Sequence, residues 1–441
     1  MRSRLKGLAT GEGLVQRAFR GSAFTIIGFG GQQGIRLASN LILTRLLFPE
    51  VFGIMAIIMV VIQGLNNFSD MGISPAIMQS RRGDDQRYLN TAFTMQVIRG
   101  VVLWLGCCAI ALPMARFYDV PELAWFLPVA GLVSVIQGLT PTKVETANRH
   151  IRVGRLTAVE LAGAVISTTL TVAMAAVIGS AWALVIALVL SALVNLALVW
   201  WLLPGAPNRF EWDRSAAAEL IAFGKWILPS TILGFALAQG DKAILGRFLT
   251  MSELGIYNIA FFLASFPLML GTALVGRLMI PVYRNVNEDP SARRWRQLRR
   301  MRFGLTGAFL SLLAVLAILG PQLVDLLYDN RYAEAGPLLT LVALATIPQL
   351  IGMTYDSAAL AAGNSRGFFW LMLLRATLFI SFFLIGAQWG GIPGALLGQA
   401  MAAIAAYPFL VGLARKHGIW DWRHDLAYGL VGAALAAMLL G

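Results

Sequence analysis

Long apolar runs recur along the whole chain, and short segments rich in charge, proline or glycine separate them. A helix needs about 20 apolar residues to cross a bilayer, where the backbone finds no hydrogen-bond partners outside its own helix. Hydrophobic residues make up 58% of the 441 positions and charged residues only 13%. A typical soluble chain is about 25% charged. The sequence therefore predicts an all-α polytopic membrane protein with about 12 spans.

A polar segment punctuated by proline and glycine divides these runs into two halves. The last apolar run, 425–441, has about 17 residues, which suits either a marginal thirteenth span or an interfacial piece. Within the first half we expect unbroken spans over 51–79 and 122–145. The predicted parts are a cytoplasmic N-terminal segment (1–20), an N-lobe (21–203), a linker (204–221), a C-lobe (222–413) and a C-terminal segment (414–441).

The two halves carry a similar pattern after their first span. The first reads TRLLFPEVFGIMAI and the second GRFLTMSELGIYNI, so that Arg45 matches Arg247 and Gly53 matches Gly255, both 202 positions apart. Two sets of six spans with the same orientation form a parallel repeat about an axis along the membrane normal. We therefore expect two six-helix lobes, related by a pseudo-two-fold axis, around a central cavity that alternates its access.

The net charge of +13 is concentrated in alternate loops. Short loops rich in arginine and lysine mark the cytoplasmic side of a membrane protein. The N-terminus is therefore expected in the cytoplasm. No aromatic stacking platform accompanies the basic residues, so that nucleic-acid binding is not expected.

The first predicted span, Gly21 to Leu46, has one polar face. At about 100° per residue, Gln33, Arg36 and Asn40 lie together on it. Polar groups inside a span are costly and point to function. We predict that these three residues contact a substrate in the cavity, with Arg36 as a cationic anchor for an anionic or sugar-bearing molecule. The alternative is an internal salt bridge from Arg36 that fixes helix packing.

The first span of the second half carries a similar pair, Asp241 and Lys242. They are further candidates for substrate binding, with Lys242 as a second cation, and a purely structural ion pair is the alternative. Asp70 and Asp356 are candidate carriers of a coupling proton or cation, although Asp70 is equally suited to a cap at a span end. The five other intramembrane charges lie near span ends, where snorkelling to the interface is favoured: Arg99, Glu145, Glu160, Lys225 and Arg375.

No catalytic arrangement emerges from the sequence. The three histidines lack metal-ligand spacing, and the adjacent Cys107 and Cys108 lie inside an apolar run, where they suit packing. There is no nucleotide-binding motif and no large loop. We therefore expect no enzyme activity, no metal and no cofactor, and transport driven by an ion gradient or by the substrate's own gradient.

The run SNLILTRLLFPEVFGIMAIIMVVIQGLNNFSDMGISPAIMQ resembles the first helical hairpin of Wzx-type polysaccharide flippases. These belong to the polysaccharide-transporter branch of the multidrug/oligosaccharidyl-lipid/polysaccharide exporter superfamily. The segment KVETANRHIRVGRLTAVEL is similar to the family's basic loop before the fifth span. The matching motif is carried by Thr44, Arg45, Leu46, Leu47, Pro49, Glu50, Phe52, Gly53, Asp70, Gly72 and Gln79.

This resemblance implies a bacterial inner-membrane protein that moves undecaprenyl-diphosphate-linked oligosaccharides to the outer leaflet for lipopolysaccharide or exopolysaccharide export. It also allows a polysaccharide polymerase and the export machinery as partners. Three alternatives stay open. A cation-coupled drug antiporter of the same superfamily would favour acidic cavity residues, and a lipid II flippase would share the fold. A membrane glycosyltransferase or polymerase would usually need a large external loop, which this chain lacks.

Overall fold

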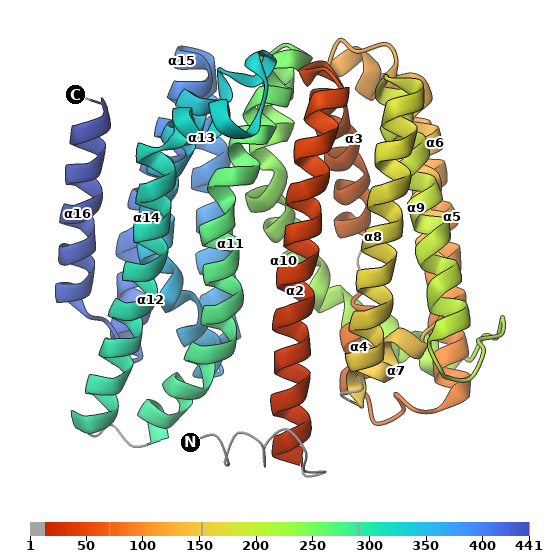
Figure 1. Cartoon of the computed structure of the whole chain (residues 1–441). Helices are drawn as coiled ribbons and strands as arrows, with labels where there is room; N and C mark the ends of the chain where they lie inside the picture. The colour runs from red at the N-terminus through yellow and green to blue at the C-terminus, as the bar shows by residue number, and fades with distance from the viewer. Residues whose placement is uncertain (1–13, 70, 151–152, 289–291, 441) are drawn as a thin grey trace. The chain divides into compact units, whose positions relative to one another are not determined.

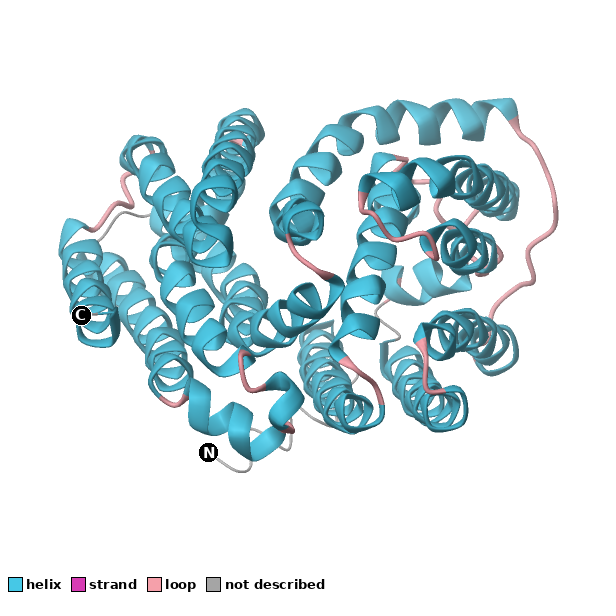
Figure 2. Cartoon of the chain, turned by 90° about the horizontal axis from the view of Figure 1, so that it is seen from above, coloured by secondary structure: helices cyan, strands magenta, loops and turns pink. Residues whose placement is uncertain are grey.

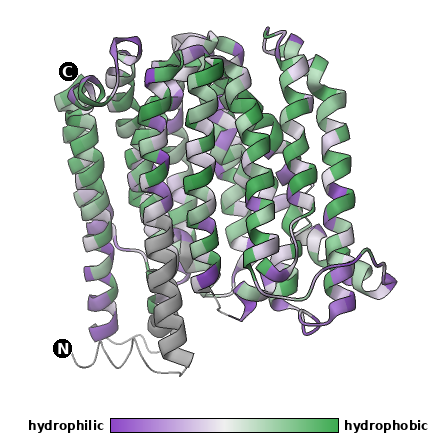
Figure 3. Cartoon of the chain, turned by 45° about the vertical axis from the view of Figure 1, so that its right-hand side comes forward, coloured by the Kyte–Doolittle hydropathy of each residue, from purple (hydrophilic) through white to green (hydrophobic). Residues whose placement is uncertain are grey.

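The computed structural model describes residues 14–69, 71–150, 153–288 and 292–440, and across these ranges the chain folds into helices and loops without a strand (Figures 1 and 2). Hydrophobic residues dominate the middle of the helices, whereas hydrophilic residues gather at helix ends and in loops (Figure 3). Two compact units divide the chain, an N-terminal unit (Met1–Ile232) and a C-terminal unit (Leu233–Gly441). The all-helical class predicted from the sequence is confirmed.

Eight of the described helices are long and apolar enough to cross a membrane, and two bent helix pairs raise that number to ten. The N-terminal unit contains α2 (Leu14–Leu46), α3 (Pro49–Phe68), α4 (Ile73–Gln79), α5 (Gln86–Phe117), α6 (Leu123–Gly138), α7 (Lys143–Arg149), α8 (Val153–Ile178), α9 (Ala181–Leu202) and the first part of α10 (Arg214–Phe248). The C-terminal unit contains the rest of α10, α11 (Met251–Glu288), α12 (Ala292–Ile318), α13 (Gly320–Leu327), the 3₁₀ turn η1 (Asn330–Tyr332), α14 (Ala335–Ala361), α15 (Ser365–Lys416) and α16 (Trp422–Leu440).

Two segments that we expected to be single spans are broken. Helix α3 ends at Phe68 and α4 begins at Ile73, with Gly72 between them in the left-handed conformation at φ 57°. Helix α6 ends at Gly138 and meets α7 at an angle of 57°. Apolar composition alone does not reveal such breaks, because the residues on both sides remain hydrophobic.

Helix α15 is a hairpin of two antiparallel arms. The chain turns at Gly390 and Gly391, the second of which has φ 56° and ψ −140°. The arms pack backbone to backbone, since a Cβ on Gly386 would lie 2.1 Å from the carbonyl oxygen of Gly394. Only glycine permits so close an approach. The two arms occupy the positions of two successive spans that the sequence predicts, over about 367–388 and 391–413.

The segment that we predicted as a linker is hydrogen-bonded to the N-terminal unit. Asn208 accepts a hydrogen bond from the backbone N–H of Thr142 at 2.9 Å. Glu211 accepts one from the Asn90 side chain at 2.8 Å. Helix α10 begins inside this segment, at Arg214, because the Asp213 carboxylate caps it by accepting from the backbone N–H of Ser215 at 2.7 Å.

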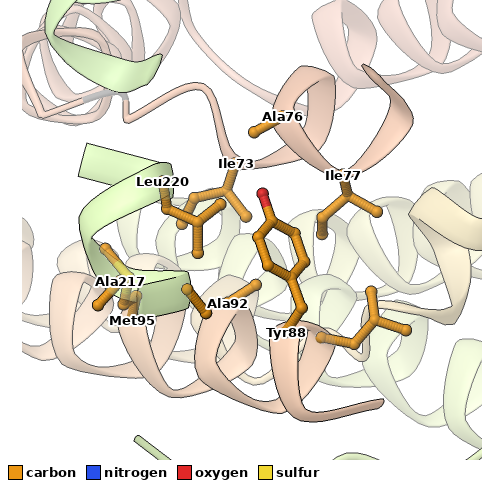
Figure 4. Packing of buried hydrophobic residues seen from close by; sticks show 10 residues of the cluster. Ile73, Ala76, Ile77, Tyr88, Ala92, Met95, Ala217 and Leu220 are labelled. Carbon is orange, nitrogen blue, oxygen red and sulfur yellow. The ribbon is translucent and has the colours of Figure 1, made fainter. Parts of the chain in front are cut away.

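The first turns of α10 are anchored by a small hydrophobic core. Ala217 and Leu220 pack against residues of α4 and α5, with the aromatic ring of Tyr88 among them (Figure 4). Tyr88, Ile77 and Leu220 are fully buried. Burial of each such side chain contributes about 1.5–3 kcal/mol. The start of α10 is therefore part of the N-terminal unit rather than a free connection.

Candidate functional site

Helix α2 packs against α8 through residues that precede Arg36. Gly31 contacts α8 so closely that a Cβ there would lie 3.0 Å from Leu161, and the Gln32 side chain donates to Glu160 at 3.5 Å. Arg36 lies about one turn further along the helix. Its side chain is exposed, whereas the predicted contact residues Gln33 and Asn40 are half-buried. The helix thus carries a guanidinium that could bind phosphate through charge-assisted hydrogen bonds.

The break between α3 and α4 contains a polar cluster. Arg99 donates through Nε to the Ser69 hydroxyl at 2.9 Å and through Nη2 to the carbonyl oxygen of Asn66 at 2.7 Å. The hydroxyl of Thr231 donates to the carbonyl oxygen of Asn67 at 3.1 Å. These donors satisfy carbonyls that the end of α3 leaves without helical partners. Arg99 therefore caps the end of a broken helix. From the sequence we had favoured snorkelling of this side chain to the membrane interface.

The motif residue Asp70, predicted as a coupling-ion candidate, lies outside the described residues. Gly72, two positions later, is buried in the same break, and a Cβ there would lie 2.4 Å from Cδ1 of Ile227 on α10. The glycine is required both by its positive φ and by this close approach. The backbone on one side of Asp70 is thus fixed against α10 within the N-terminal unit.

Asp241 is almost fully buried in the C-terminal unit, with 3% of its surface exposed. The hydroxyl of Tyr257, on α11, donates to its Oδ2 at 2.8 Å. The neighbouring Gly240 packs against the ring of Phe379 on α15, where an added Cβ would lie 3.0 Å from a ring carbon. A buried carboxylate is costly unless it is paired and hydrogen-bonded. The position of Asp241 is therefore fixed by contacts with both α11 and α15.

Lys242 is half-buried beside this carboxylate. Its ammonium lies 5.0 Å from the centre of the Phe261 ring, a cation–π distance. The rings of Phe261 and Tyr257 are themselves 5.9 Å apart. Two successive residues of α10 are thus held by two aromatic residues one turn apart on α11. The ring of Phe261 orients the ammonium, and the roles of Asp241 and Lys242 in substrate binding stay predictions.

Asp356, the second coupling-ion candidate, forms an ion pair across α14 and α15. Its Oδ1 lies 2.8 Å from Nη1 of Arg375, and the side chains are 30% and 18% exposed. Its carboxylate therefore already has a cationic partner in this structure. An incoming proton or cation would have to compete with Arg375 for the same oxygen atoms.

The sequence reasoning missed a large buried polar network in the C-terminal unit. Arg302 of α12 is fully buried. Its Nη1 donates to the carbonyl oxygen of Ile419 at 2.8 Å and its Nη2 to the hydroxyl of Tyr283 at 3.0 Å. Its guanidinium lies 4.2 Å from the centre of the Tyr355 ring. One side chain thus ties α12 to α11, α14 and the turn before α16.

The start of α16 completes this network through Asp425. Its carboxylate accepts hydrogen bonds from the hydroxyl groups of Tyr355 (2.8 Å) and Tyr407 and from the indole of Trp420 (3.0 Å). In the ring of His424, Nδ1 lies 2.7 Å from Oδ1 of Asp425, and Nε2 lies 2.9 Å from the hydroxyl oxygen of Thr306. The histidine is therefore a buried packing residue, and α16 begins at a fixed place on the unit.

A local sequence signal for this network is the segment Asp421 to Asp425, which reads DWRHD and precedes an apolar run. Arg302 and its partner Ile419 are separated by 117 positions. No local periodicity links residues at such a distance. The described residues contain no group of three or more histidine, cysteine, aspartate or glutamate side chains suited to a metal ion.

A protein-family model described as "Polysaccharide biosynthesis protein" matches residues 42–337. The curated relatives include the succinoglycan biosynthesis transport protein ExoT of Rhizobium meliloti, which is 24% identical over 86% of this chain and 75% of its own length. They also include the lipopolysaccharide biosynthesis protein WzxC of Escherichia coli, 23% identical over 84% of this chain and 75% of its own length.

Solved structures share the fold at low identity. The lipid II flippase MurJ in an inward closed conformation aligns with a TM-score of 0.68 and 11% identity, over 95% of this chain and 92% of its own. An inward-facing multidrug resistance MATE family transporter of the MOP superfamily aligns with a TM-score of 0.64 and 14% identity, over 92% and 96%. These likenesses establish the fold class.

Proposed function

Because the chain belongs to the polysaccharide biosynthesis protein family, we propose that it is a flippase for a lipid-linked oligosaccharide. The observation that carries this proposal is the family match, which extends over residues 42–337 of a multi-span helical chain. The protein is a transporter rather than an enzyme. Its substrate is an undecaprenyl-diphosphate-linked oligosaccharide that moves from the cytoplasmic to the outer leaflet by alternating access.

The physical task of such a protein is narrow. A diphosphate and its sugars cannot cross hydrocarbon unaided, whereas a prenyl tail can remain in the lipid. The protein must supply a polar route with cations for the phosphates. Arg36 and Lys242 serve as these cations, and the amides of Gln33 and Asn40 serve as hydrogen-bond partners for sugar hydroxyls. Asp241 orients Lys242. The exposed side chain of Arg36 and the ring contact of Lys242 support these roles.

The finer layout follows from the sequence repeat. Twelve spans form two six-helix lobes around a central cavity, and α16 adds a short thirteenth apolar helix. The N-terminus lies in the cytoplasm of a bacterium, because the basic loops alternate with loops that are nearly free of basic residues apart from Arg331. Asp70 and Asp356 carry the coupling proton or cation. A polysaccharide polymerase and the export machinery receive the product.

Reconstituted proteoliposomes test the proposal. The purified protein is inserted into liposomes that contain a fluorescent undecaprenyl-diphosphate-linked oligosaccharide, and a membrane-impermeant reagent reports how much substrate changes leaflet. We expect leaflet exchange that protein-free liposomes lack. Absence of exchange, together with proton-driven export of an organic cation from the same liposomes, would establish the drug antiporter instead.

A further inference from the structure

The described end of the C-terminal unit near the start of α16 is strongly basic. Five exposed cations from three helices gather there, and we call them the basic end: Arg293, Arg300, Arg415, Lys416 and Arg423. The Arg415 guanidinium lies 3.9 Å from the centre of the Trp420 ring. Arg299 of α12 pairs with Asp421 at 2.9 Å. These contacts place the end of α15, the start of α16 and the first turns of α12 side by side.

Acidic groups are few on the segments that carry these cations. Within α12 and from Arg415 to the end of the described chain, the acidic residues are Asp421 and Asp425. Both are buried, and both are committed to hydrogen bonds or an ion pair inside the unit. The basic segment of the N-terminal unit differs, since Arg82 pairs with Asp85 at 3.1 Å and with Asp213 at 3.4 Å.

The position of the basic end along the helices matches a membrane surface. Helix α12 has no charged residue after Arg302, so its hydrocarbon-facing part begins at Phe303. Trp422 is 52% exposed at the first position of α16. Tryptophan is enriched where hydrocarbon meets the headgroup layer. The cations nearest to Phe303 and Trp422, which are Arg300 and Arg423, are therefore expected close to the depth of lipid phosphates.

We propose that the basic end binds the phosphate groups of anionic phospholipids in the adjacent leaflet. Guanidinium groups bind phosphate oxygens through paired, charge-assisted hydrogen bonds. The buried contacts of Asp421 and Asp425 hold the three helix ends in place, so the cations meet the lipid as one preformed surface. This inference does not depend on the transported substrate.

Lipid titration of the purified protein, followed by native mass spectrometry, tests this site. The probes are phosphatidylglycerol and, as the neutral comparison, phosphatidylcholine. We expect the protein to prefer phosphatidylglycerol by about tenfold or more, since each surface cation contributes about 1 kcal/mol toward an anionic lipid. The triple variant Arg300→Gln, Lys416→Gln, Arg423→Gln should lose most of that preference.

A charge-matched control removes three exposed arginines from the N-terminal unit: Arg81→Gln, Arg209→Gln and Arg214→Gln. It should keep the preference, as should Arg300→Lys with Arg423→Lys, which retains the charge. The single variants Arg300→Gln and Lys416→Gln give the same comparison with less risk to folding. Equal binding of both lipids by the parent, or an equal loss in the test and control triples, would overturn the proposal.

Discussion

The guanidinium of Arg302 lies over the ring of Tyr355, 4.2 Å from its centre, and both residues are buried between α12 and α14. Arg302 also donates to Tyr283 and to the turn that precedes α16. We expect Arg302→Met to destabilise the protein by about 3 kcal/mol, because the loss leaves buried acceptors without donors. Arg302→Lys should also destabilise, since an ammonium lacks the planar fork that reaches several acceptors.

Denaturant unfolding monitored by tryptophan fluorescence in detergent measures this effect. The matched control is Arg293→Met, which removes an exposed cation from the same helix and should leave the midpoint nearly unchanged. Equal midpoints for Arg302→Met and Arg293→Met would show that the buried network contributes no stability.

Gly72 should tolerate no side chain. Gly72→Ala places a Cβ 2.4 Å from Ile227 and forces an L residue into a left-handed conformation. The conformational strain alone costs about 1–2 kcal/mol. We expect a lower unfolding midpoint, with partial recovery in the double variant Gly72→Ala, Ile227→Ala, which removes the clash but not the strain. Gly30→Ala is the control, because no atom lies within 4 Å of an added Cβ there.

Tyr257 should act through its hydroxyl group. Tyr257→Phe keeps the ring that contacts Phe261 but removes the donor to Asp241. We expect a loss of about 1.5–3 kcal/mol in the free energy of unfolding, as for hydrogen bonds to charged groups. The same substitution in an Asp241→Asn background should cost much less. Additive effects of the two substitutions in this double-mutant cycle would contradict the hydrogen bond.

Asp213 should make the stability of the folded protein depend on pH. Hydrogen bonds from the Ser215 side chain and from the backbone N–H groups of Ala216 and Ser215 lower the pKa of this carboxyl to about 2, below its ordinary 3.8. The unfolded chain therefore takes up the proton first as the pH falls. The stabilisation is complete above about pH 4 and disappears toward about pH 2.

Unfolding midpoints of the parent and of Asp213→Ala, measured between these pH values, check the prediction. The parent should be more stable above pH 4, and the difference should shrink as the pH falls. A difference that stays constant across this range would indicate that the carboxylate acts only as a packing group.

The sequence predicted the helical class well, because hydrocarbon imposes one requirement on every span. Long apolar runs identified most of the helices, including the two arms of α15, where the sequence predicts spans over about 367–388 and 391–413. Breaks were less visible. The α3–α4 break depends on Arg99, which lies on α5 and donates to the carbonyl oxygen of Asn66, 33 positions earlier. Such a contact is set by tertiary packing rather than by local composition.

The partners of the polar residues were likewise not predictable from local sequence. Asp241 and Lys242 stood out because intramembrane charges are rare, but their partners Tyr257 and Phe261 could not be distinguished from ordinary apolar positions of α11. Arg302 did not stand out, because it lies at the boundary between a basic segment and a predicted span over about 302–328. The roles of Arg36, Gln33 and Asn40 in substrate binding stay predictions.

The most direct measurement compares leaflet exchange of an undecaprenyl-diphosphate-linked oligosaccharide in proteoliposomes that contain the parent, Arg36→Gln or Lys242→Gln. Arg116→Gln removes an exposed cation at the end of α5 and serves as the control. Each anchor variant should slow exchange by about tenfold or more, since a charge-assisted hydrogen bond contributes about 1.5–3 kcal/mol. Arg116→Gln should exchange at the parental rate. Parental rates in both anchor variants would contradict the claim that these two cations hold the diphosphate.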